Sequence, residues 1–189
     1  MSLKVGAVAR PKVGQDISGD AYEVIESSGT LLVALADGLG SGSSAAQAAQ
    51  LAMDVVRSNA RASLPDLLRL CHQALRGTRG AVMGLLEITP ARGHVAYVAI
   101  GNIECTTVSA TGFKPLAAYG IVGRRLPRLR SFEGAYTPGD LFALSTDGIS
   151  RKFNWNGLPS LEKEPQALAE TIARHYARPD DDVTILVIR

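Results

Sequence analysis

The chain has few aromatic residues, few cysteines and almost no net charge, and each shortage excludes a class of protein. Aromatic side chains make up only 5% of its 189 residues, so a core has to be built from leucine, valine, isoleucine and alanine. A net charge of +2 is too small to indicate a nucleic-acid partner, because such a partner requires a strongly basic face. Cys71 and Cys105 have neither zinc-site spacing nor the number for a disulfide framework. We expect both to be reduced and packed as small hydrophobic residues.

Long apolar runs are also missing. No segment approaches the ~18 consecutive apolar residues of a membrane-spanning helix. The amino-terminal stretch is interrupted at Arg10 and Pro11, too early for a secretory signal. Apolar residues reach 46% and charged residues 20%, which is typical of a folded globular protein. We therefore expect residues 1–189 to form one domain of a monomeric cytoplasmic protein, without membrane or nucleic-acid partners.

Hydrophobic patterns and turn residues divide the chain into strands and three helices. The continuous apolar run at residues 31–36 is typical of a strand that is buried on both faces. Helices are predicted over residues 43–57, 65–75 and 165–176, the last two with proline in the first turn. The other predicted strands are residues 5–9, 22–26, 81–88, 94–100, 105–108, 130–135, 141–145 and 183–188.

Short connections between the middle strands indicate an antiparallel meander. Turns such as Thr89-Pro90 and Gly101-Asn102 leave no room for the crossover helices that parallel strands need. The order of elements is strands, two helices, several strands, one helix and a final strand. This order predicts an α+β fold, an antiparallel β-sandwich flanked by helices on both sides in α-β-β-α layers.

The apolar run at residues 31–36 ends in Asp37, just before a glycine-rich stretch. Residues 40–45 satisfy G-x-G-x-x-A, the pattern of a loop that holds a pyrophosphate at a helix N-terminus. Asp37 would repel that anion, and the alternating strands and helices of a dinucleotide-binding fold are missing. Nucleotide binding is therefore the weaker hypothesis. Ser41 and Ser43 are expected to cap the helix that follows.

Asp37 is one of several acidic residues at predicted strand ends. A second apolar strand ends in Asp147 and Gly148, an acidic triple at residues 180–182 precedes the last strand, and Asp20 precedes an early one. A single Asp-Gly pair is usually only a turn. A folded sheet, however, can gather strand ends at one edge. Carboxylates without histidine or cysteine favour Mg²⁺ or Mn²⁺, so the set predicts a metal site.

These acidic motifs resemble those of the PPM (protein phosphatase 2C-like) family of metal-dependent serine/threonine phosphatases. The resemblance implies a β-sandwich flanked by helix pairs, in a compact form without a large flap or regulatory domain. The string ADGLGSGSSA and the lack of an attached sensor domain are similar to the small stand-alone phosphatases of the bacterial stressosome pathway. The motifs that carry the resemblance are, in order, Gly19-Asp20, Ala36-Asp37-Gly38, Ser145-Thr-Asp147-Gly148 and Asp181-Asp-Val-Thr184.

The resemblance also implies roles for individual residues. Asp37 would bridge two Mn²⁺ or Mg²⁺ ions, and the Gly38 carbonyl would bind the first of them. Asp147 and Asp181 would complete the second metal site, and Asp20 would act through a metal-bound water. Asp37 and Asp147 would thereby be catalytic, since they hold the ions that activate a bridging water for attack on phosphorus.

Three further features are interpreted through the same resemblance. Asp182, next to the chosen ligand, is expected to hydrogen-bond the neighbouring loop. Arg10 is the only candidate for the arginine with which many relatives position phosphate, upstream of the first acidic motif. Residues 123–130 contain four arginines where longer relatives carry a flap. They either grip an acidic or phosphorylated partner or form a solvated basic loop.

The activity implied is the hydrolysis of phosphoserine and phosphothreonine without a covalent intermediate. The implied substrates are phosphorylated STAS-domain proteins of the stressosome, with dephosphorylation acting as negative feedback in a bacterial stress response. Two alternatives stay open. One is a non-catalytic module that binds a partner on the same fold, and the other is a related phosphatase that acts on an anti-sigma-factor antagonist.

Overall fold

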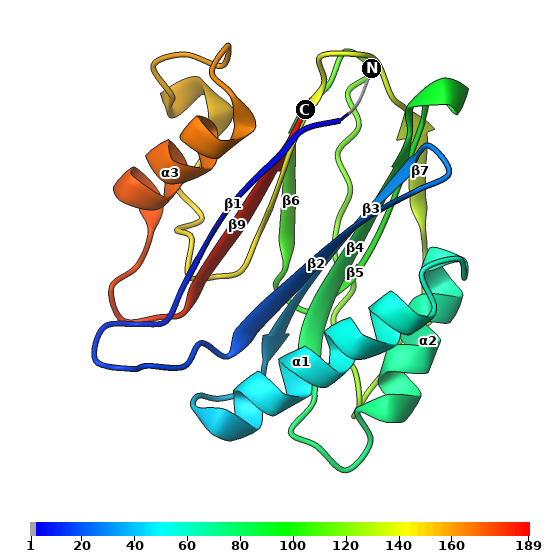
Figure 1. The fold of residues 1–189 in the computed structure, drawn as a ribbon, viewed down its shortest axis with the longest axis vertical. Helices are drawn as coiled ribbons and strands as arrows, with labels where there is room; N and C mark the ends of the chain where they lie inside the picture. Colours follow the sequence, from blue (N-terminus) through cyan, green and yellow to red (C-terminus); the bar gives the residue numbers. More distant parts are fainter. Residues whose placement is uncertain (1–2) are drawn as a thin grey trace.

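The computed structural model describes residues 3–189, and its strands form two antiparallel sheets (Figure 1). One sheet has four strands in the order β1-β9-β8-β6, and the other has five in the order β2-β3-β4-β5-β7. The bounds of the first sheet are β1 Val5–Arg10, β6 Glu104–Val108, β8 Leu141–Ser145 and β9 Val183–Ile188. Those of the second are β2 Asp20–Ser27, β3 Thr30–Gly38, β4 Ala81–Thr89, β5 His94–Ile100 and β7 Phe132–Ala135.

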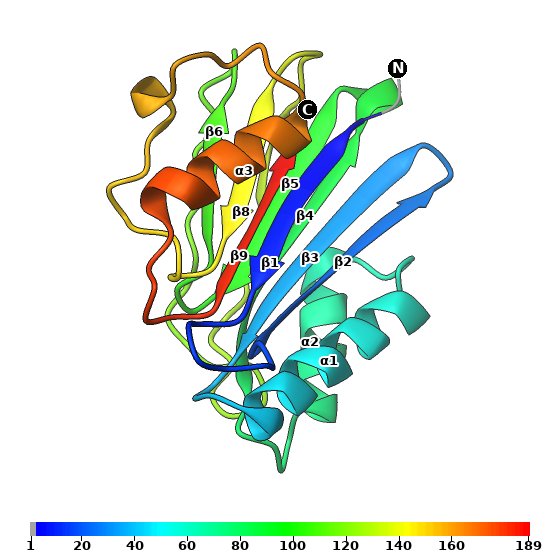
Figure 2. The same ribbon diagram turned by 60° about the vertical axis from the view of Figure 1, so that its left-hand side comes forward.

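Helices cover the outer face of each sheet. Helices α1 (Ser43–Ser58) and α2 (Leu64–Ala74) pack on the five-stranded sheet, and α3 (Pro165–Tyr176) packs on β1 and β9 (Figures 1 and 2). This arrangement confirms the predicted α-β-β-α layers. Within residues 3–189, no helix has the length and apolar character needed to cross a membrane.

The expectation of a helix pair on both sides is wrong for the four-stranded sheet. Between β8 and α3 the described chain forms only a short 3-10 helix, Trp155–Gly157, in place of a second α-helix. Phe153 and Trp155 are buried here in the same cluster as Leu168 and Ile172 of α3. Two large aromatic side chains thus cover the area that a second helix would have covered.

Strand β3 shows why its sequence is apolar at every position. Leu31, Val33 and Leu35 point between the two sheets, whereas the intervening Leu32, Ala34 and Ala36 point toward α1 and α2. Successive strand residues face opposite sides, so a strand covered on both sides needs apolar residues throughout. The predicted meander of the middle strands holds only for β4 and β5, because β6 and β8 pair in the other sheet and β7 pairs with β5. The other sheet instead joins β1 and β9, from opposite ends of the described chain.

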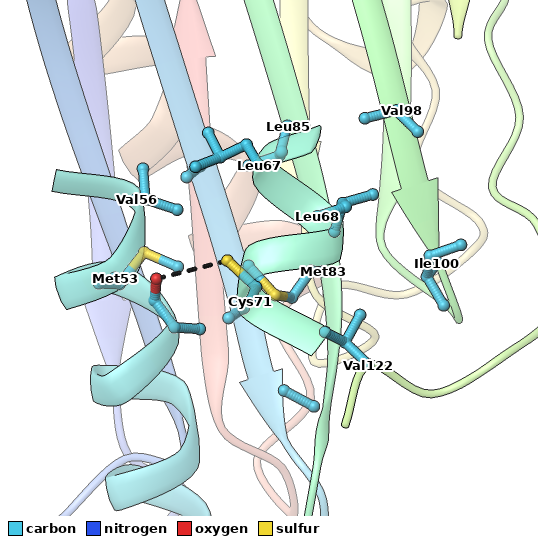
Figure 3. Packing of buried hydrophobic residues seen from close by; sticks show 14 of the residues in the cluster. Met53, Val56, Leu67, Leu68, Cys71, Met83, Leu85, Val98, Ile100 and Val122 are labelled. Atoms are coloured by element: carbon cyan, nitrogen blue, oxygen red, sulfur yellow. Dashed lines mark hydrogen bonds between the residues drawn. The ribbon is translucent and has the colours of Figure 1, made fainter. Parts of the chain in front are cut away.

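Buried apolar side chains of α1 and α2 pack against those of the five-stranded sheet (Figure 3). Ala49 and Ala52 of α1 are fully buried, and the Cys71 thiol of α2 donates to the Ala52 carbonyl oxygen at 3.8 Å. Burial raises the pKa of Cys71 to about 12, so the thiol stays protonated at neutral pH. Both cysteines are free, as predicted, and Cys105 is partly buried.

The start of α1 differs from the expectation. The N-cap is Gly42, and no side chain caps the helix, so the predicted capping by Ser41 and Ser43 is wrong. The chain enters α1 with Gly42 at φ 74°, a left-handed conformation that favours glycine over serine. In contrast, α2 has the expected features, with Pro65 in its first turn and the Ser63 hydroxyl accepting from the Asp66 N–H.

Candidate active site

The acidic residues meet where strand ends from both sheets come together. Asp20 begins β2 and lies opposite Asp37 of β3 in the antiparallel register. In the other sheet, Asp147 follows β8 and Asp181 precedes the neighbouring strand β9. Because β8 and β9 are antiparallel, the end of one lies beside the start of the other. The predicted convergence of strand ends is therefore present.

Four carboxylates line one open cavity of about 570 Å³ at this end of the sandwich. Asp20 is not in its lining, although the like charges of Asp182 and Asp147 reach it. Arg151 is the one basic residue among the lining residues of this cavity. The lining consists of Asp37, Leu39, Gly40, Val82, Gly101, Asn102, Tyr119, Gly120, Ile121, Asp147, Arg151, Asp181 and Asp182.

Asp182 holds the loop that precedes β2. Its carboxylate accepts from the backbone N–H of Lys12 at 2.9 Å and from that of Gly19 at 2.7 Å. Its own N–H donates to Asp181 Oδ1 at 3.0 Å, and its side chain is buried, with the residue 8% exposed. The expectation that Asp182 hydrogen-bonds the neighbouring loop is confirmed.

Two neutral side chains orient further carboxylates. The Thr146 hydroxyl donates to Asp20 Oδ2 at 2.9 Å and accepts from the Thr184 N–H at 3.1 Å. Asn102 donates from Nδ2 to Asp147 Oδ2 at 2.7 Å, and its buried Oδ1 has no partner within the described residues. These hydrogen bonds fix the direction of the Asp20 and Asp147 carboxylates, as a site for a charged ligand requires.

The glycines after the two strand-tip aspartates are required by packing. A Cβ at Gly38 would overlap the carbonyl oxygen of Ala45 in α1. A Cβ at Gly148 would overlap the carbonyl oxygen of Asp182. In both places the missing side chain lets a second backbone segment lie directly against the acidic strand end. These contacts explain both glycines by packing alone.

Burial and mutual repulsion make the carboxylates hard to ionise. Burial is the main reason that the pKa of Asp37 is raised to about 8, and the charges of Asp20 and Asp147 raise it further. The pKa of Asp20 is raised to about 7, again mainly by burial. Burial and the charge of Asp147 also raise the pKa of Asp181. A cation that neutralised these groups would favour their ionised forms.

The donor set fits a hard divalent cation. The groups are carboxylate and backbone oxygens, and none of the three histidines lines the cavity. Mg²⁺ and Mn²⁺ prefer such ligands. Within residues 3–189, no three acidic, histidine or cysteine side chains already have the arrangement of a metal site.

The basic residues of the site differ from the sequence-based choice. Arg10 ends β1, pairs with Val183 in the register and is not part of the cavity lining. Arg151, just after the Asp147-Gly148 motif, lines the cavity and forms an ion pair with Glu104 at 3.5 Å. Sequence reasoning missed Arg151 because it lies in an irregular loop whose direction no local pattern specifies.

Asn102 and Tyr119 were also missed as site residues. The Gly101-Asn102 pair was recognised as a turn, and that turn brings the Asn102 amide to Asp147. Tyr119 is 85% exposed although it lines the cavity. An aromatic residue between Ala118 and Gly120 gives no pattern that would indicate a site.

The strand pairing is antiparallel throughout both sheets, which also disfavours the dinucleotide-binding interpretation of residues 40–45.

Comparison with known proteins gives relatives along nearly the whole chain. The sequence model of the Stage II sporulation protein E (SpoIIE) family matches residues 27–189. Phosphoserine phosphatase RsbX of Bacillus subtilis (strain 168) is 30% identical over 181 residues, which cover 93% of this chain and 89% of RsbX.

Solved structures agree with these relatives. A chain in the structure "The bacterial stressosome: a modular system that has been adapted to control secondary messenger signaling" is 36% identical, with a TM-score of 0.95 and 100% of both chains covered. RsbX in complex with magnesium is 24% identical, with a TM-score of 0.85, and the match covers 98% of this chain and 94% of that one. The PP2C phosphatase domain of SpoIIE from Bacillus subtilis shares the fold, with a TM-score of 0.77, 20% identity, and 100% of this chain and 63% of that chain covered. The chain therefore belongs to the PPM (protein phosphatase 2C-like) family and is a phosphatase domain of the SpoIIE type.

Proposed function

We propose that residues 1–189 act as one metal-dependent phosphatase domain that hydrolyses phosphoserine and phosphothreonine in proteins. The observation that carries the proposal is the shared cavity of Asp37, Asp147, Asp181 and Asp182, at the ends of strands from both sheets. The similarity to phosphoserine phosphatase RsbX supports the reaction. The similarity to a chain of a stressosome structure supports phosphorylated STAS-domain stressosome proteins as substrates, with negative feedback on a stress response as the outcome.

The proposed cofactors are two Mn²⁺ or Mg²⁺ ions. Asp37, the Gly38 carbonyl, Asp147 and Asp181 would hold them, and Asp20 would contribute through a bound water. When bound, such ions supply an activated water and neutralise charge on the phosphoryl group. The magnesium complex of RsbX supports a divalent ion.

The chain's own side chains prepare this site. Asn102 holds the Asp147 carboxylate in one direction, and Thr146 does the same for Asp20. Arg151 supplies a positive charge among the residues that line the cavity, which suits a phosphate oxygen, whereas Arg10 is not in the lining. Arg10 remains the candidate suggested by the family resemblance. No protein nucleophile is needed, because water is the attacking group.

The test is phosphate release from a phosphoserine STAS-domain protein by the purified protein with manganese. Asp37→Asn and Asp147→Asn are each expected to lower kcat by at least about 100-fold, because each removes charge that the metals require. Asp180→Asn is the matched control, since Asp180 belongs to the same acidic triple but is exposed and pairs only with Arg178 at 3.6 Å. Full activity in the Asp37 and Asp147 variants, or after complete chelation, contradicts the proposal.

The second candidate is a module that binds a partner on this fold without turnover. The four carboxylates that share one cavity, Asp37, Asp147, Asp181 and Asp182, speak against it. Tight partner binding without metal-dependent hydrolysis would favour it. If the protein dephosphorylates an anti-sigma-factor antagonist faster than STAS stressosome proteins, that antagonist is its substrate instead. We further propose that the protein acts as a monomer in the cytoplasm, which size-exclusion chromatography and cell fractionation test.

A further inference from the structure

Two segments of the chain contain basic residues and no acidic ones. Residues 67–86 and 105–132 together carry eight lysines and arginines and neither aspartate nor glutamate. In the rest of the chain acidic residues outnumber basic ones, so the small net charge of +2 hides a separation of charge. The two segments meet in space beside the acidic cavity.

Backbone hydrogen bonds fix that meeting point. Val122 and Ala81 exchange N–H···O bonds of 2.8 and 3.0 Å. The Gly123 N–H donates to His72 Nδ1 of α2 at 2.9 Å. Arg125 and Ile121 close a tight turn with reciprocal bonds of 2.8 and 2.9 Å. The backbone that carries the first two arginines of residues 123–130 is therefore anchored to α2 and β4.

The side chains of this segment are divided between the core and the solvent. Leu126 and Leu129 pack against the cluster formed by α1, α2 and the five-stranded sheet. The four arginines are exposed, and within residues 3–189 their guanidinium groups make no hydrogen bond or ion pair. The arginines are Arg124, Arg125, Arg128 and Arg130.

Three arginines lie next to residues that line the cavity without lining it themselves, and we call them the basic collar: Arg79, Arg124 and Arg125. Arg79 Nη1 lies 2.5 Å from where a Cβ of Gly40 would stand, and Gly40 lines the cavity. The side chain of Arg124 passes Gly80, with Cγ 3.5 Å from the corresponding point. The backbone of Arg125 is hydrogen-bonded to that of Ile121, which lines the cavity. Positive charge thus lies beside a cavity whose charged lining residues are four aspartates and one arginine.

We propose that the basic collar binds acidic residues that flank the phosphorylated serine or threonine of the protein substrate. This rests on the proposed phosphatase function and adds a substrate class to it. A substrate whose phosphate enters the cavity must lay its neighbouring residues across the adjoining surface. Unpaired arginines on an anchored backbone attract carboxylates there, which steers the substrate and offsets the repulsion from the cavity carboxylates. A nucleic acid fits less well, because outside the two segments the chain is acidic.

The experiment uses three synthetic phosphoserine peptides that differ only in having acidic, neutral or basic flanking residues, and p-nitrophenyl phosphate as a substrate without flanks. The test variant is Arg124→Glu with Arg125→Glu. The matched control is Arg61→Glu with Arg92→Glu, which changes the net charge equally. Arg61 and Arg92 are exposed, and Arg92 follows the end of β4 opposite the cavity.

In the wild-type protein we expect kcat/KM to be highest for the acidic-flank peptide. The test variant should lose about tenfold or more on that peptide and keep its rate on p-nitrophenyl phosphate. The control variant should keep both rates. The preference should also fade toward about 1 M salt, where the Debye length is about 3 Å. Equal kcat/KM for the acidic and neutral peptides, or an equal loss in both variants, overturns the proposal.

Binding separates a failure of the collar from a failure of the phosphatase assignment. Fluorescence anisotropy of the labelled acidic and neutral peptides is measured in metal-free protein, where hydrolysis is blocked by chelation. Tighter binding of the acidic peptide that the test variant loses supports the collar even if no peptide is hydrolysed. Equal binding of both peptides, or tighter collar-dependent binding of a single-stranded RNA oligonucleotide, contradicts it even if hydrolysis is fast.

Discussion

Replacing Asp182 with alanine removes the acceptor that holds the loop of residues 11–19 against the acidic cavity. The carboxylate accepts from the Lys12 and Gly19 N–H groups, and the Gly19 bond is buried. A buried donor left without a partner costs about 1–3 kcal/mol. The Lys12 N–H is partly exposed, so water replaces part of its lost bond. We therefore expect Asp182→Ala to lower the free energy of unfolding by about 3 kcal/mol.

An opposing effect must be kept small in this measurement. Removing Asp182 also removes a negative charge that raises the pKa values of Asp20 and Asp37. Those pKa values are about 7 and about 8, so at a pH near 6 both groups are mostly protonated and little repulsion is relieved. The hydrogen-bond loss therefore dominates under acidic conditions. At higher pH the relief grows, and the measured loss should shrink.

The assay is urea unfolding of metal-free protein at a pH near 6, followed by circular dichroism. Asp182→Asn keeps one acceptor oxygen but turns an amide donor toward the second N–H, so its loss should be similar or slightly smaller. Asp180→Ala, with an exposed side chain, should stay within about 0.5 kcal/mol of the wild type. A loss below about 1 kcal/mol for Asp182→Ala would refute the assigned role.

Two further predictions concern charge and packing at the same site. The folded-state pKa values of Asp20 and Asp37, about 7 and about 8, lie above the ordinary value of 3.8, so the folded state binds protons more tightly. Their contribution to stability is present below about pH 4 and is lost as the pH rises toward 8. The melting temperature of the metal-free protein should therefore fall over this range, and Mn²⁺ should raise it most at the alkaline end. Asp37→Asn should reduce the dependence of the melting temperature on pH. A metal-free melting temperature that rises with pH to the same extent in wild type and Asp37→Asn contradicts this. Gly148→Ala should cost about 3 kcal/mol or more in urea unfolding, because its Cβ overlaps the Asp182 carbonyl, whereas Gly112→Ala, at φ 70° in open space, should cost about 1 kcal/mol. Equal losses of unfolding free energy in the two glycine variants would show that the backbone around Gly148 shifts to make room for the added Cβ, and would contradict the prediction.

The sequence predicted most of the elements, and residue spacing explains why. The apolar run at residues 31–36 has only one stable placement, a strand with both faces covered, and β3 has that placement. Prolines marked the starts of α2 and α3 because proline has no N–H to lose in the first turn. The errors within elements were small: β2 begins at Asp20 rather than residue 22, and α1 is capped by Gly42. The larger errors concerned arrangement, namely the second helix expected on the four-stranded sheet and the single meander expected of the middle strands.

The position of the acidic residues along the chain was also sufficient to predict their convergence. Asp37, Asp147 and Asp181 all lie at strand ends, and antiparallel pairing brings Asp37 to Asp20 and the end of β8 to the start of β9. Stacking of the two sheets then brings the two pairs to one cavity. The metal roles of these residues stay predictions. Arg151 and Asn102 could not be found in this way, because each lies in a loop and reaches the cavity only through the turn of that loop.

The amino-acid sequence by itself determined the local elements and the chemistry of the acidic residues, since both depend on residue type and short-range spacing. Tertiary structure alone decided which distant segments touch. It paired β1 with β9 across the length of the chain and placed Asp182 against Gly19 and Gly148. It also placed Arg124 and Arg125 next to Ile121, which lines the cavity. Such contacts depend on packing summed over the whole fold, because no short stretch of sequence contains both partners.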